Sequence, residues 1–542
     1  MERKSSSSKK HVNNEEVKSE SYHSLFTLSL FTFFLLAWAW ASWWMGDIFR
    51  VAYEQSFFAT DATLMHFLLQ QHLGWLWLAG RALLTLYRWP ILGGLVVAMM
   101  LTATTCSIAR LMPTRDDGHY PLSIVHYPLS LFPACIWMTW TAWTGLNLFY
   151  LAEPGRTLAV LLVMFLISTA VALIVSLFRG KATLIQQHSK PDNRNHFPLS
   201  FILYPLSIII CFAIPTAVTH LRHPYARPVT RMQVQMLNDD WSGMVTTAHD
   251  NATLSYRPLA AYYAIALVHT GHLTDALFDI RLDYDTLYLS NLSRKPDNGT
   301  NYYLVDCNYT AGLFRAATHK AMEHLTMNGP TLYSLKHLTR LALLDSAWPL
   351  ARKYLHVINQ APFESDFVNR YSAMLYNPEA VAANPEFALL RRTEPVLDSF
   401  EGEYQEPVFL GYTATLMAGR TQEALMQSLM ANLYSKRMPD FLMRTQPLIG
   451  TTPPRTIAEG LVTQVIKNPD ILQAFPQLQM NAQIYRGFIQ NVQTELKDRP
   501  AHARKLFDTY RGYYPYYYFF GNLKATRKSD NKEHASSNVG VN

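Results

Sequence analysis

The chain has 542 residues, with 47 Lys and Arg against 40 Asp and Glu, a formal net charge of +7 and only four cysteines. Its large apolar residues are concentrated in the first 220 positions, which excludes a single water-soluble globule. The modest positive charge is spread over loops and tails, which argues against a nucleic-acid partner, and four cysteines are too few for a disulfide scaffold.

Five segments are predicted to cross a membrane. A spanning helix needs about 20 apolar residues, because the bilayer core offers no water to its backbone groups. Each of the five lacks Asp, Glu, Lys and Arg, which are costly at mid-membrane. The predicted spans are Leu25–Met45, Ile91–Ala109, Pro128–Leu151, Leu158–Phe178 and Phe197–Val218.

The first apolar run could instead be a signal peptide, since lysines precede it. However, Trp43-Trp44-Met45-Gly46 offers no small-residue cleavage site, so we expect a retained helix. A sixth segment, Leu64–Leu86, is interrupted by Gln70, Gln71, His72 and Arg81 and is predicted to be interfacial or re-entrant.

Five crossings from a cytoplasmic N-terminus place the C-terminal half on the opposite side of the membrane. The counts of Lys and Arg in the loops barely separate five crossings from six, so the polar interruption in Leu64–Leu86 decides for five. In a Gram-negative cell the C-terminal half would be periplasmic. The prediction is a multi-pass protein of the bacterial inner membrane.

Beyond Leu221 the continuous apolar runs end, and apolar residues recur with the spacing of amphipathic helices. The alternation of apolar and polar residues that is typical of strands is almost absent. In Ala266–Leu277, Gly271 separates an apolar helix end from a small residue, Ala276, five positions later. This is typical of tetratricopeptide-like helix pairs, and Leu341–Leu355 and Leu416–Leu425 are similar. An irregular helical array is the alternative, because the spacing is uneven.

The predicted fold is therefore all-α: a bundle of about five transmembrane helices followed by a tetratricopeptide-like α-solenoid. The predicted domains are a disordered N-terminal segment 1–21, a transmembrane domain 22–220, a helical-repeat domain 221–523 and a disordered tail 524–542.

No catalytic residue, metal site or cofactor is predicted. His269 and His272 are three positions apart, but no third ligand or general base stands at a recognisable spacing. The sequence has no Gly-rich phosphate loop, nucleophile elbow or Cys-x-x-Cys pair. Whether the protein is an enzyme is therefore open, with a binding role favoured.

The candidate binding residues are Asp47, Glu54 and Gln55, which follow the first span at membrane-surface depth. Integral-membrane glycosyltransferases often place a carboxylate there, where it can bind a metal or deprotonate an acceptor. The alternative is that these groups end the helix and meet lipid headgroups. A second open question concerns the aromatic stretch Tyr513–Phe520, which could cap the last repeat, stack on sugars or lie at the membrane interface.

Short motifs carry a resemblance to a known family: Tyr53-Glu54-Gln55, the helix start Ala351–Leu355, Asp508-Thr509-Tyr510 and Tyr516–Phe519. The chain resembles an uncharacterised family of bacterial polytopic membrane proteins, defined by a domain of unknown function, with a tetratricopeptide-like C-terminal half. The resemblance implies fold and location and no reaction.

Together these features predict an integral inner-membrane protein that contacts membrane lipid and binds a protein or peptide partner through its extracytoplasmic helical repeats. The alternative function is a membrane glycosyltransferase, polymerase or ligase acting on envelope glycans.

Overall fold

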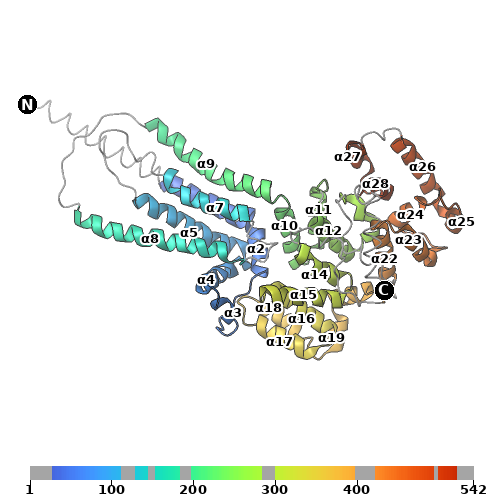
Figure 1. The fold of residues 1–542 in the computed structure, drawn as a ribbon, viewed down its shortest axis with the longest axis horizontal. Coiled ribbons are helices and arrows are strands. Elements are labelled where there is room, and N and C mark those ends of the chain that lie inside the picture. Colours follow the sequence, from blue (N-terminus) through green and yellow to red (C-terminus); the bar gives the residue numbers. More distant parts are fainter. Residues whose placement is uncertain are drawn as a thin grey trace, which may run out of the picture. The chain divides into compact units, whose positions relative to one another are not determined.

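A computed structural model of the chain describes residues 27–111, 128–144, 153–182, 197–254, 256–282, 300–396, 421–493 and 499–521. Across these residues the protein is all-α, without β-strands. It divides into an N-terminal unit, Met1–Leu148 with Ala152–Arg227, and a C-terminal unit, Phe149–Leu151 with Pro228–Asn542 (Figure 1). The predicted disordered ends, 1–21 and 524–542, lie outside the described residues.

Four described helices of the N-terminal unit are long and apolar enough to cross a membrane. They are Thr27–Trp44, Pro90–Leu111, Arg156–Leu177 and Ile202–Arg222. They coincide with the first, second, fourth and fifth predicted spans, and they indicate a membrane protein. The third predicted span is described only as far as residue 144, as α7 (Phe132–Thr144), and stays a prediction.

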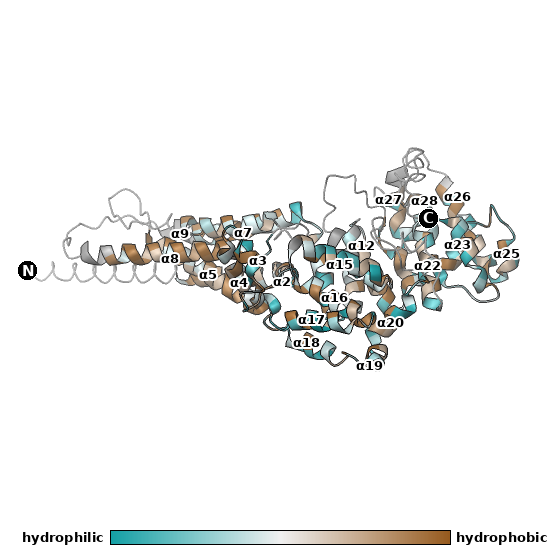
Figure 2. Ribbon diagram, turned by 60° about the horizontal axis from the view of Figure 1, so that its bottom comes forward, coloured by the Kyte–Doolittle hydropathy of each residue, from teal (hydrophilic) through white to brown (hydrophobic). Residues whose placement is uncertain are grey.

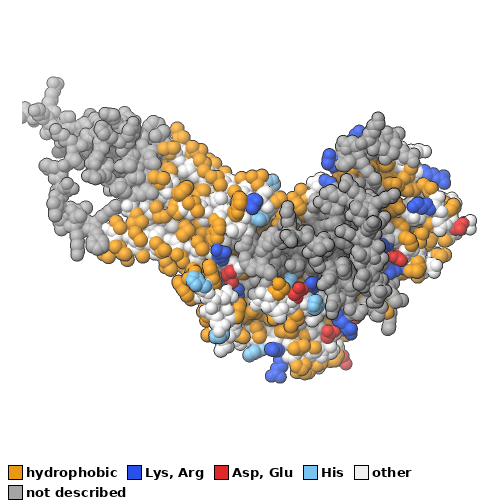
Figure 3. All heavy atoms as spheres, viewed as in Figure 1, with side chains coloured by type: hydrophobic (Ala, Val, Ile, Leu, Met, Phe, Trp, Pro, Cys, Tyr) orange, Lys and Arg blue, Asp and Glu red, His pale blue; other side chains and the backbone are white. Residues whose placement is uncertain are grey.

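The long helices expose apolar side chains, as a lipid-facing surface requires. On α8 (Arg156–Ala182), Leu173 and Leu177 are 62% and 66% exposed. Figure 2 shows α5 (Pro90–Leu111) and α8 as predominantly hydrophobic, and Figure 3 shows apolar side chains over the described surface of these helices. In water this surface would be a strong aggregation site.

Short helices occupy the sequence between the first and second long helices. The last turn of the first helix is the π-helical η1 (Trp40–Trp44), and α2 (Gly46–Glu54) follows it. The segment predicted to be interfacial forms α3 (His66–Leu69), α4 (Gly74–Leu84) and η2 (Thr85–Arg88). None of these three has the length needed to cross a bilayer.

A glycine contact brings α4 against the start of α8. A Cβ atom on Gly80 would lie 2.2 Å from the carbonyl oxygen of Gly155, so the two backbones touch where neither residue carries a side chain. Small residues permit this close helix packing in membrane bundles. The contact positions Arg81, the next residue of α4, beside Glu153.

The C-terminal unit consists of short to medium helices. Its longer helices are α10 (Ala226–Leu237), α11 (Trp241–Asp250), α12 (Arg257–Thr270), α14 (Thr300–Thr310), α15 (Phe314–Asn328), α16 (Leu332–Leu344), α17 (Trp348–Ile358), α22 (Gln422–Tyr434), α26 (Gln479–Gln493) and α27 (Arg499–Tyr510). The shorter ones are α13 (Leu273–Ala276), η4 (Leu277–Asp279), α18 (Ser365–Ser372), α19 (Pro378–Ala383), α20 (Pro385–Thr393), α23 (Met438–Arg444), η5 (Gln446–Leu448), α24 (Arg455–Val462), α25 (Ile471–Ala474), η6 (Pro476–Leu478) and α28 (Tyr514–Phe520).

Local sequence explains where several of these helices start. Thr331, Asn384 and Thr421 accept a backbone N–H of the first turn of α16, α20 and α22, which satisfies donors that the helix leaves unpaired. Pro349 and Pro385 stand in the first turn of α17 and α20, where proline loses no helical hydrogen bond. These starts are thus fixed by polar and proline residues rather than by the apolar pattern.

Six helix pairs in the described part of the C-terminal unit are joined by the same kind of turn. Each has one residue with positive φ, between 56° and 79°, one or two positions after the last residue of the first helix. These residues are Asp239, Gly271, Gly312, Ser346, Lys436 and Gly512. In the first five turns the next residue donates its N–H to the carbonyl five positions back, at 2.8–2.9 Å, which is the Schellman geometry.

Each of these turns also shares a pattern of apolar side chains. A large apolar residue stands two positions after the positive-φ residue, and a second apolar residue stands five positions after it. The first set is Trp241, Leu273, Phe314, Trp348, Met438 and Tyr514; the second is Met244, Ala276, Ala317, Ala351, Phe441 and Tyr517. In the pairs α14 and α15, α16 and α17, and α22 and α23, the second helix packs on the first.

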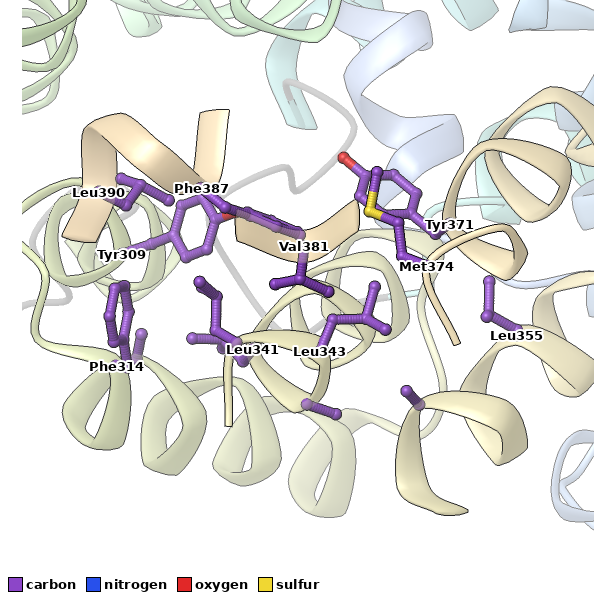
Figure 4. Packing of buried hydrophobic residues seen from close by; sticks show 14 residues of the cluster. Tyr309, Phe314, Leu341, Leu343, Leu355, Tyr371, Met374, Val381, Phe387 and Leu390 are labelled. Atoms are coloured by element: carbon purple, nitrogen blue, oxygen red, sulfur yellow. The ribbon is translucent and has the colours of Figure 1, made fainter. Parts of the chain in front are cut away.

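One buried cluster connects the helices from α14 to α20 (Figure 4). Phe314 and Leu341 lie on one side of it, and Tyr371 and Leu355 on the other. Leu343 and Leu390 are fully buried, and each such side chain contributes roughly 1.5–3 kcal/mol by leaving water. These helices therefore share a continuous hydrophobic core.

Candidate functional site

The predicted binding residues lie on and just after α2. Asp47 is in the first turn and partly exposed, Glu54 is the last helical residue, and Gln55 is the C-cap. Glu54 is 3% exposed and its Oε1 accepts a hydrogen bond from Nη1 of Arg50 at 2.6 Å. The Glu54 carboxylate therefore compensates a buried guanidinium one helical turn away, and its role in binding stays a prediction.

A second ion pair, between buried Arg81 and partly buried Glu153, joins α4 to the start of α8. Arg81 donates to both carboxylate oxygens of Glu153, from Nε at 2.6 Å and from Nη2 at 2.5 Å. Its Nη1 donates to the carbonyl oxygen of Phe57 at 3.1 Å. Such a two-point pair is strong and directional, because the planar guanidinium matches the carboxylate.

The two ion pairs share a segment of backbone. Residues 54–57 carry Glu54 of the first pair and the Phe57 carbonyl that Arg81 binds. In the sequence, Arg81 is predicted only to interrupt the apolar segment Leu64–Leu86, and Glu153 is not among the predicted site residues. Two features of the sequence could have indicated this pair: Arg81 is a single cation in an apolar segment, and Glu153 is an acid just before a predicted apolar span.

In the C-terminal unit, Asp306 is the centre of a buried polar network. Its Oδ2 accepts from the Tyr262 hydroxyl at 2.8 Å, and its Oδ1 lies 2.9 Å from Nε2 of His337. Tyr262 also accepts from Nε2 of Gln233 at 2.8 Å. Burial, reinforced by the Asp306 charge, raises the pKa of Tyr262 well above its ordinary value, so the hydroxyl keeps its proton and donates it.

A second network surrounds Glu386. Its two carboxylate oxygens accept from the hydroxyls of Tyr309 at 2.7 Å and Tyr371 at 2.9 Å. Nε of Arg340 donates to the Tyr371 hydroxyl at 2.8 Å and lies 3.5 Å from Glu386. Burial opposes ionisation of Glu386, but Arg340 and the two tyrosine hydrogen bonds outweigh it and lower the pKa of Glu386.

Helix α16 links these networks, since Lys336, His337 and Arg340 all lie on it. Lys336 pairs with Glu364 at 2.9 Å, and both side chains are less than 10% exposed. Both ring nitrogens of His337 face protein atoms, because Nδ1 lies 3.0 Å from the Tyr333 carbonyl. These ionisable groups are partnered by protein, so they stabilise the packing of α12, α14, α16 and α20 rather than present an open catalytic site.

The two histidines considered as metal ligands have separate environments. The His269 ring stacks on Trp241 with 3.6 Å between ring centroids, and burial lowers the pKa of His269 to about 4. His272 is the exposed residue preceding α13. Within the residues that the structure describes, no group of three or more His, Cys, Asp or Glu side chains is arranged to hold a metal ion.

The aromatic stretch at the end of the described chain forms α28. Tyr514, Tyr517 and Phe520 are buried, and the Tyr517 hydroxyl donates to the Tyr434 carbonyl at 2.7 Å. The ring of Phe278 in η4 contacts Tyr517 at 4.7 Å between centroids. The buried side of this stretch therefore packs inside the C-terminal unit.

A cavity of about 80 Å³ lies between η4, the residues that follow it, α27 and α28. Two cationic side chains, Arg281 and Arg504, contribute to its lining. Its aromatic walls come from Phe278, Phe507, Tyr516, Tyr517 and Phe520. The lining of this cavity thus combines aromatic side chains with two guanidinium groups.

The family of unknown function DUF6057 matches residues 130–521, more than half of the chain. The chain belongs to this family. No curated protein and no solved structure matches it.

The DUF6057 match separates the candidate residues into two sets. Asp47, Glu54 and Arg81 precede residue 130, so they lie outside the matched region. Glu153, both polar networks of the C-terminal unit and the aromatic cavity lie within it. The region that matches the DUF6057 family is thus the C-terminal unit with α7, α8 and α9 before it, and the first two long apolar helices lie outside it.

Proposed function

We propose that this DUF6057 protein is a membrane-anchored binding protein whose C-terminal unit is a tetratricopeptide-like array of helix pairs that binds a protein or peptide. The observation that carries the proposal is the shared turn: six helix pairs repeat one positive-φ position and one apolar pattern around it.

Contacts between successive helices support the array. Helix α11 packs on α12, α12 packs on α14, and α15 packs on α16. In such arrays each pair buries its apolar face only against its neighbours, so the chain can present an extended surface to a partner. A surface of this kind favours binding of peptides or proteins over small-molecule turnover.

The polar networks also favour binding over catalysis. The Asp306 and Glu386 carboxylates accept hydrogen bonds from tyrosines of the same unit, and Lys336 is paired with Glu364. A catalytic acid or base must instead reach the substrate proton. In this interpretation, the ionisable residues stabilise the packing of the helices, and the partner binds at the surface and at the aromatic cavity.

We further propose that the C-terminal unit lies outside the cytoplasm, in the periplasm of a bacterial cell, with five crossings of the inner membrane. Support comes from the four described apolar helices and from α4, which is too short to cross. Fusions of alkaline phosphatase and of a fluorescent protein that folds only in the cytoplasm, placed after residue 228 and at the C-terminus, test this. Phosphatase activity at both sites is expected, and fluorescence at either would contradict it.

Partner binding is tested with the full chain in its native membrane. Cells expressing the tagged protein are treated with a membrane-permeant cross-linker, and captured proteins are compared with those of a tagged, unrelated polytopic protein at equal abundance. We expect a reproducible partner that is absent from the control. Its absence over several growth conditions would count against the proposal.

A second candidate function, transfer of envelope glycans, is favoured by the acidic residues of α2. Asp47 is partly exposed in the first turn of α2, directly after the first membrane helix. Intramembrane and interfacial ionisable residues often mark functional sites. Asp47→Asn and Glu54→Gln should then alter the envelope glycans at normal protein abundance, and unchanged glycans would exclude this candidate.

A further inference from the structure

Two exposed arginines of the N-terminal unit lie over tryptophan rings. Cζ of Arg156 is 5.9 Å from the ring centroid of Trp77, and Cζ of Arg222 is 4.1 Å from that of Trp143. An indole in this position covers one face of the guanidinium, whose N–H groups lie in its plane and point outward. Among the described residues, neither guanidinium forms a hydrogen bond or ion pair with protein, so these donors can reach a ligand.

Both arginines stand where an apolar helix ends. Arg156 is the first residue of the candidate span Arg156–Leu177, and Arg222 is the last residue of the candidate span Ile202–Arg222. In a bilayer, residues at the ends of a spanning helix lie at the depth of the lipid headgroups. The two guanidinium groups therefore lie at the level of the phosphates.

Helix α7 shows that the two arginines lie at the same end of the unit. Nε1 of Trp137 donates to the Thr157 carbonyl at 2.9 Å, directly after Arg156. Nε2 of His223 lies 2.9 Å from the Trp143 carbonyl. Trp137 and Trp143 are only about 9 Å apart along α7, since a helix rises 1.5 Å per residue. Both arginine–tryptophan pairs thus face the same leaflet of the bilayer.

A third pair and further aromatic residues lie near the same helix ends. Cζ of Arg227 is 3.6 Å from the ring centroid of Trp44, the last residue of the first candidate span. Trp43 and Trp89 are 61% and 49% exposed, and they stand at the end of the first long helix and directly before α5. Tryptophan favours the headgroup region of a bilayer, so these side chains mark its surface.

The acids of this unit do not neutralise the exposed arginines. Within its described residues, Glu54 and Glu153 are paired with buried arginines, and Asp61 accepts hydrogen bonds from Thr63. Asp47, the fourth acid, is partly exposed. Two acids outside the buried pairs thus stand against three exposed arginines, which favours an anionic ligand.

We propose that three arginine–tryptophan pairs form a rim that binds the phosphate groups of anionic phospholipids. The pairs of this Arg–Trp rim are Arg156 with Trp77, Arg222 with Trp143 and Arg227 with Trp44. Each indole anchors its guanidinium at the bilayer surface, and the guanidinium donates in-plane hydrogen bonds to phosphate oxygens. A zwitterionic lipid presents the same phosphate beside an ammonium group, which repels the arginine. Lipid binding at this rim is independent of partner binding by the C-terminal unit.

The first test is native mass spectrometry of the full chain released from detergent micelles. The micelles contain equal amounts of phosphatidylglycerol and phosphatidylcholine with the same acyl chains. We expect adducts with phosphatidylglycerol to exceed those with phosphatidylcholine at least fivefold, because only phosphatidylglycerol carries a net negative charge. Equal adducts with both lipids would overturn the proposal.

Variants locate the site. Arg156→Gln and Arg222→Gln should each lower the preference for phosphatidylglycerol at least twofold, and the double variant should nearly abolish it. Arg352→Gln, at an exposed position on α17, loses the same charge and should behave like the parent protein. Thermal unfolding in phosphatidylcholine nanodiscs identifies any variant that has lost its fold. An unchanged preference in the folded double variant would overturn the assignment to the Arg–Trp rim.

Two further variants separate the planar guanidinium and its indole from charge alone. Arg222→Lys keeps the charge but loses the planar donors, and Trp143→Leu keeps an apolar side chain but loses the ring face; each should lower the preference at least twofold. Trp75→Leu, at a tryptophan that is 65% exposed, is the matched control and should leave it unchanged. A parental preference in Arg222→Lys, or an equal loss in both tryptophan variants, would overturn the stacked geometry.

A competition arm separates a lipid phosphate from a dissolved one. Inorganic phosphate has the same oxygens without acyl chains, so an equal concentration should leave the phosphatidylglycerol adducts in place. Displacement of these adducts by inorganic phosphate would overturn the lipid assignment and identify a site for a soluble phosphate.

Discussion

The two units of this protein compensate buried charge in different ways. In the N-terminal unit, Arg50 pairs with Glu54 and Arg81 pairs with Glu153 directly, carboxylate to guanidinium. The C-terminal unit also has one direct buried pair, Lys336 with Glu364. Around Glu386, however, tyrosine hydroxyls join the charged groups: Tyr371 accepts from Arg340 and donates to Glu386. A direct pair depends on two groups, whereas a tyrosine-bridged network distributes the hydrogen bonds over several.

This difference predicts different sensitivity to mutation. Removing one member of a direct buried pair leaves an uncompensated charge, while removing one hydroxyl from a network leaves the carboxylate with other donors.

Arg81→Met should destabilise the N-terminal unit by about 3 kcal/mol, because Glu153, whose side chain is only 16% exposed, would lose its counter-charge. The double variant Arg81→Met with Glu153→Leu should recover most of this loss, since neither charge then remains. The measurement is thermal unfolding in nanodiscs, followed by the fluorescence of the tryptophans in this unit. If the double variant were as unstable as the single one, the contrast between the units would fail at this pair.

Acid should weaken the C-terminal unit through its buried histidines. Burial lowers the pKa of His324 and of His269 to about 4, against about 6.5 when the chain is unfolded. As pH falls from about 6.5 to 4, the unfolded chain takes up protons that the folded chain refuses, so stability falls by up to about 3 kcal/mol per histidine.

Urea pulse proteolysis of the full chain at several pH values between 7 and 4 measures how the free energy of unfolding changes with pH. His324→Gln should flatten it, while His272→Gln, at an exposed position, should leave it unchanged. An unchanged slope in folded His324→Gln protein would show that other groups control the acid sensitivity.

Two glycines of the shared turn form a matched pair. Gly271 and Gly312 both have φ near +75°, but a Cβ on Gly271 meets nothing within 4 Å, whereas one on Gly312 would lie 2.5 Å from Cα of Glu394. Gly271→Ala should therefore lower the free energy of unfolding by about 1 kcal/mol through backbone strain. Gly312→Ala should cost about 2–3 kcal/mol, because the clash adds to the strain. Urea pulse proteolysis would contradict this explanation if the two costs were equal.

These turns also show how far the sequence predicts the fold. Gly271 marks its turn, because glycine adopts positive φ freely. The equivalent positions are occupied by Asp239 and Lys436 in two other turns, where the residue type does not indicate a positive φ, whereas the turn at Ser346 lies within the predicted helix pair Leu341–Leu355. The predicted turn in Leu416–Leu425 begins outside the described residues and stays a prediction; the described part of this range holds the N-cap Thr421 and the start of α22. By contrast, the span predicted as Ile91–Ala109 agrees closely with Pro90–Leu111, because a long uncharged apolar run has few alternatives.

The candidate site residues were less predictable for a physical reason. Arg81 and Glu153 are 72 residues apart, and they meet because two glycine backbones touch beside them. The Asp306 and Glu386 networks similarly depend on which helices become neighbours. A sequence pattern shows that an isolated charge in an apolar segment needs a partner, but it does not identify that partner until packing is known.

The smallest expected effect tests the tyrosine network itself. Tyr371→Phe removes the hydroxyl between Arg340 and Glu386, but Tyr309 still donates to Glu386, and Arg340 lies close enough to pair with it. Urea pulse proteolysis should therefore give a loss of about 1 kcal/mol, the usual net contribution of one hydrogen bond. Tyr376→Phe, at a side chain that is 59% exposed, is the control and should change stability by less than about 0.5 kcal/mol. A loss at Tyr371 as large as that of Arg81→Met would mean that the network does not share its hydrogen bonds, and that the two units compensate buried charge with equal fragility.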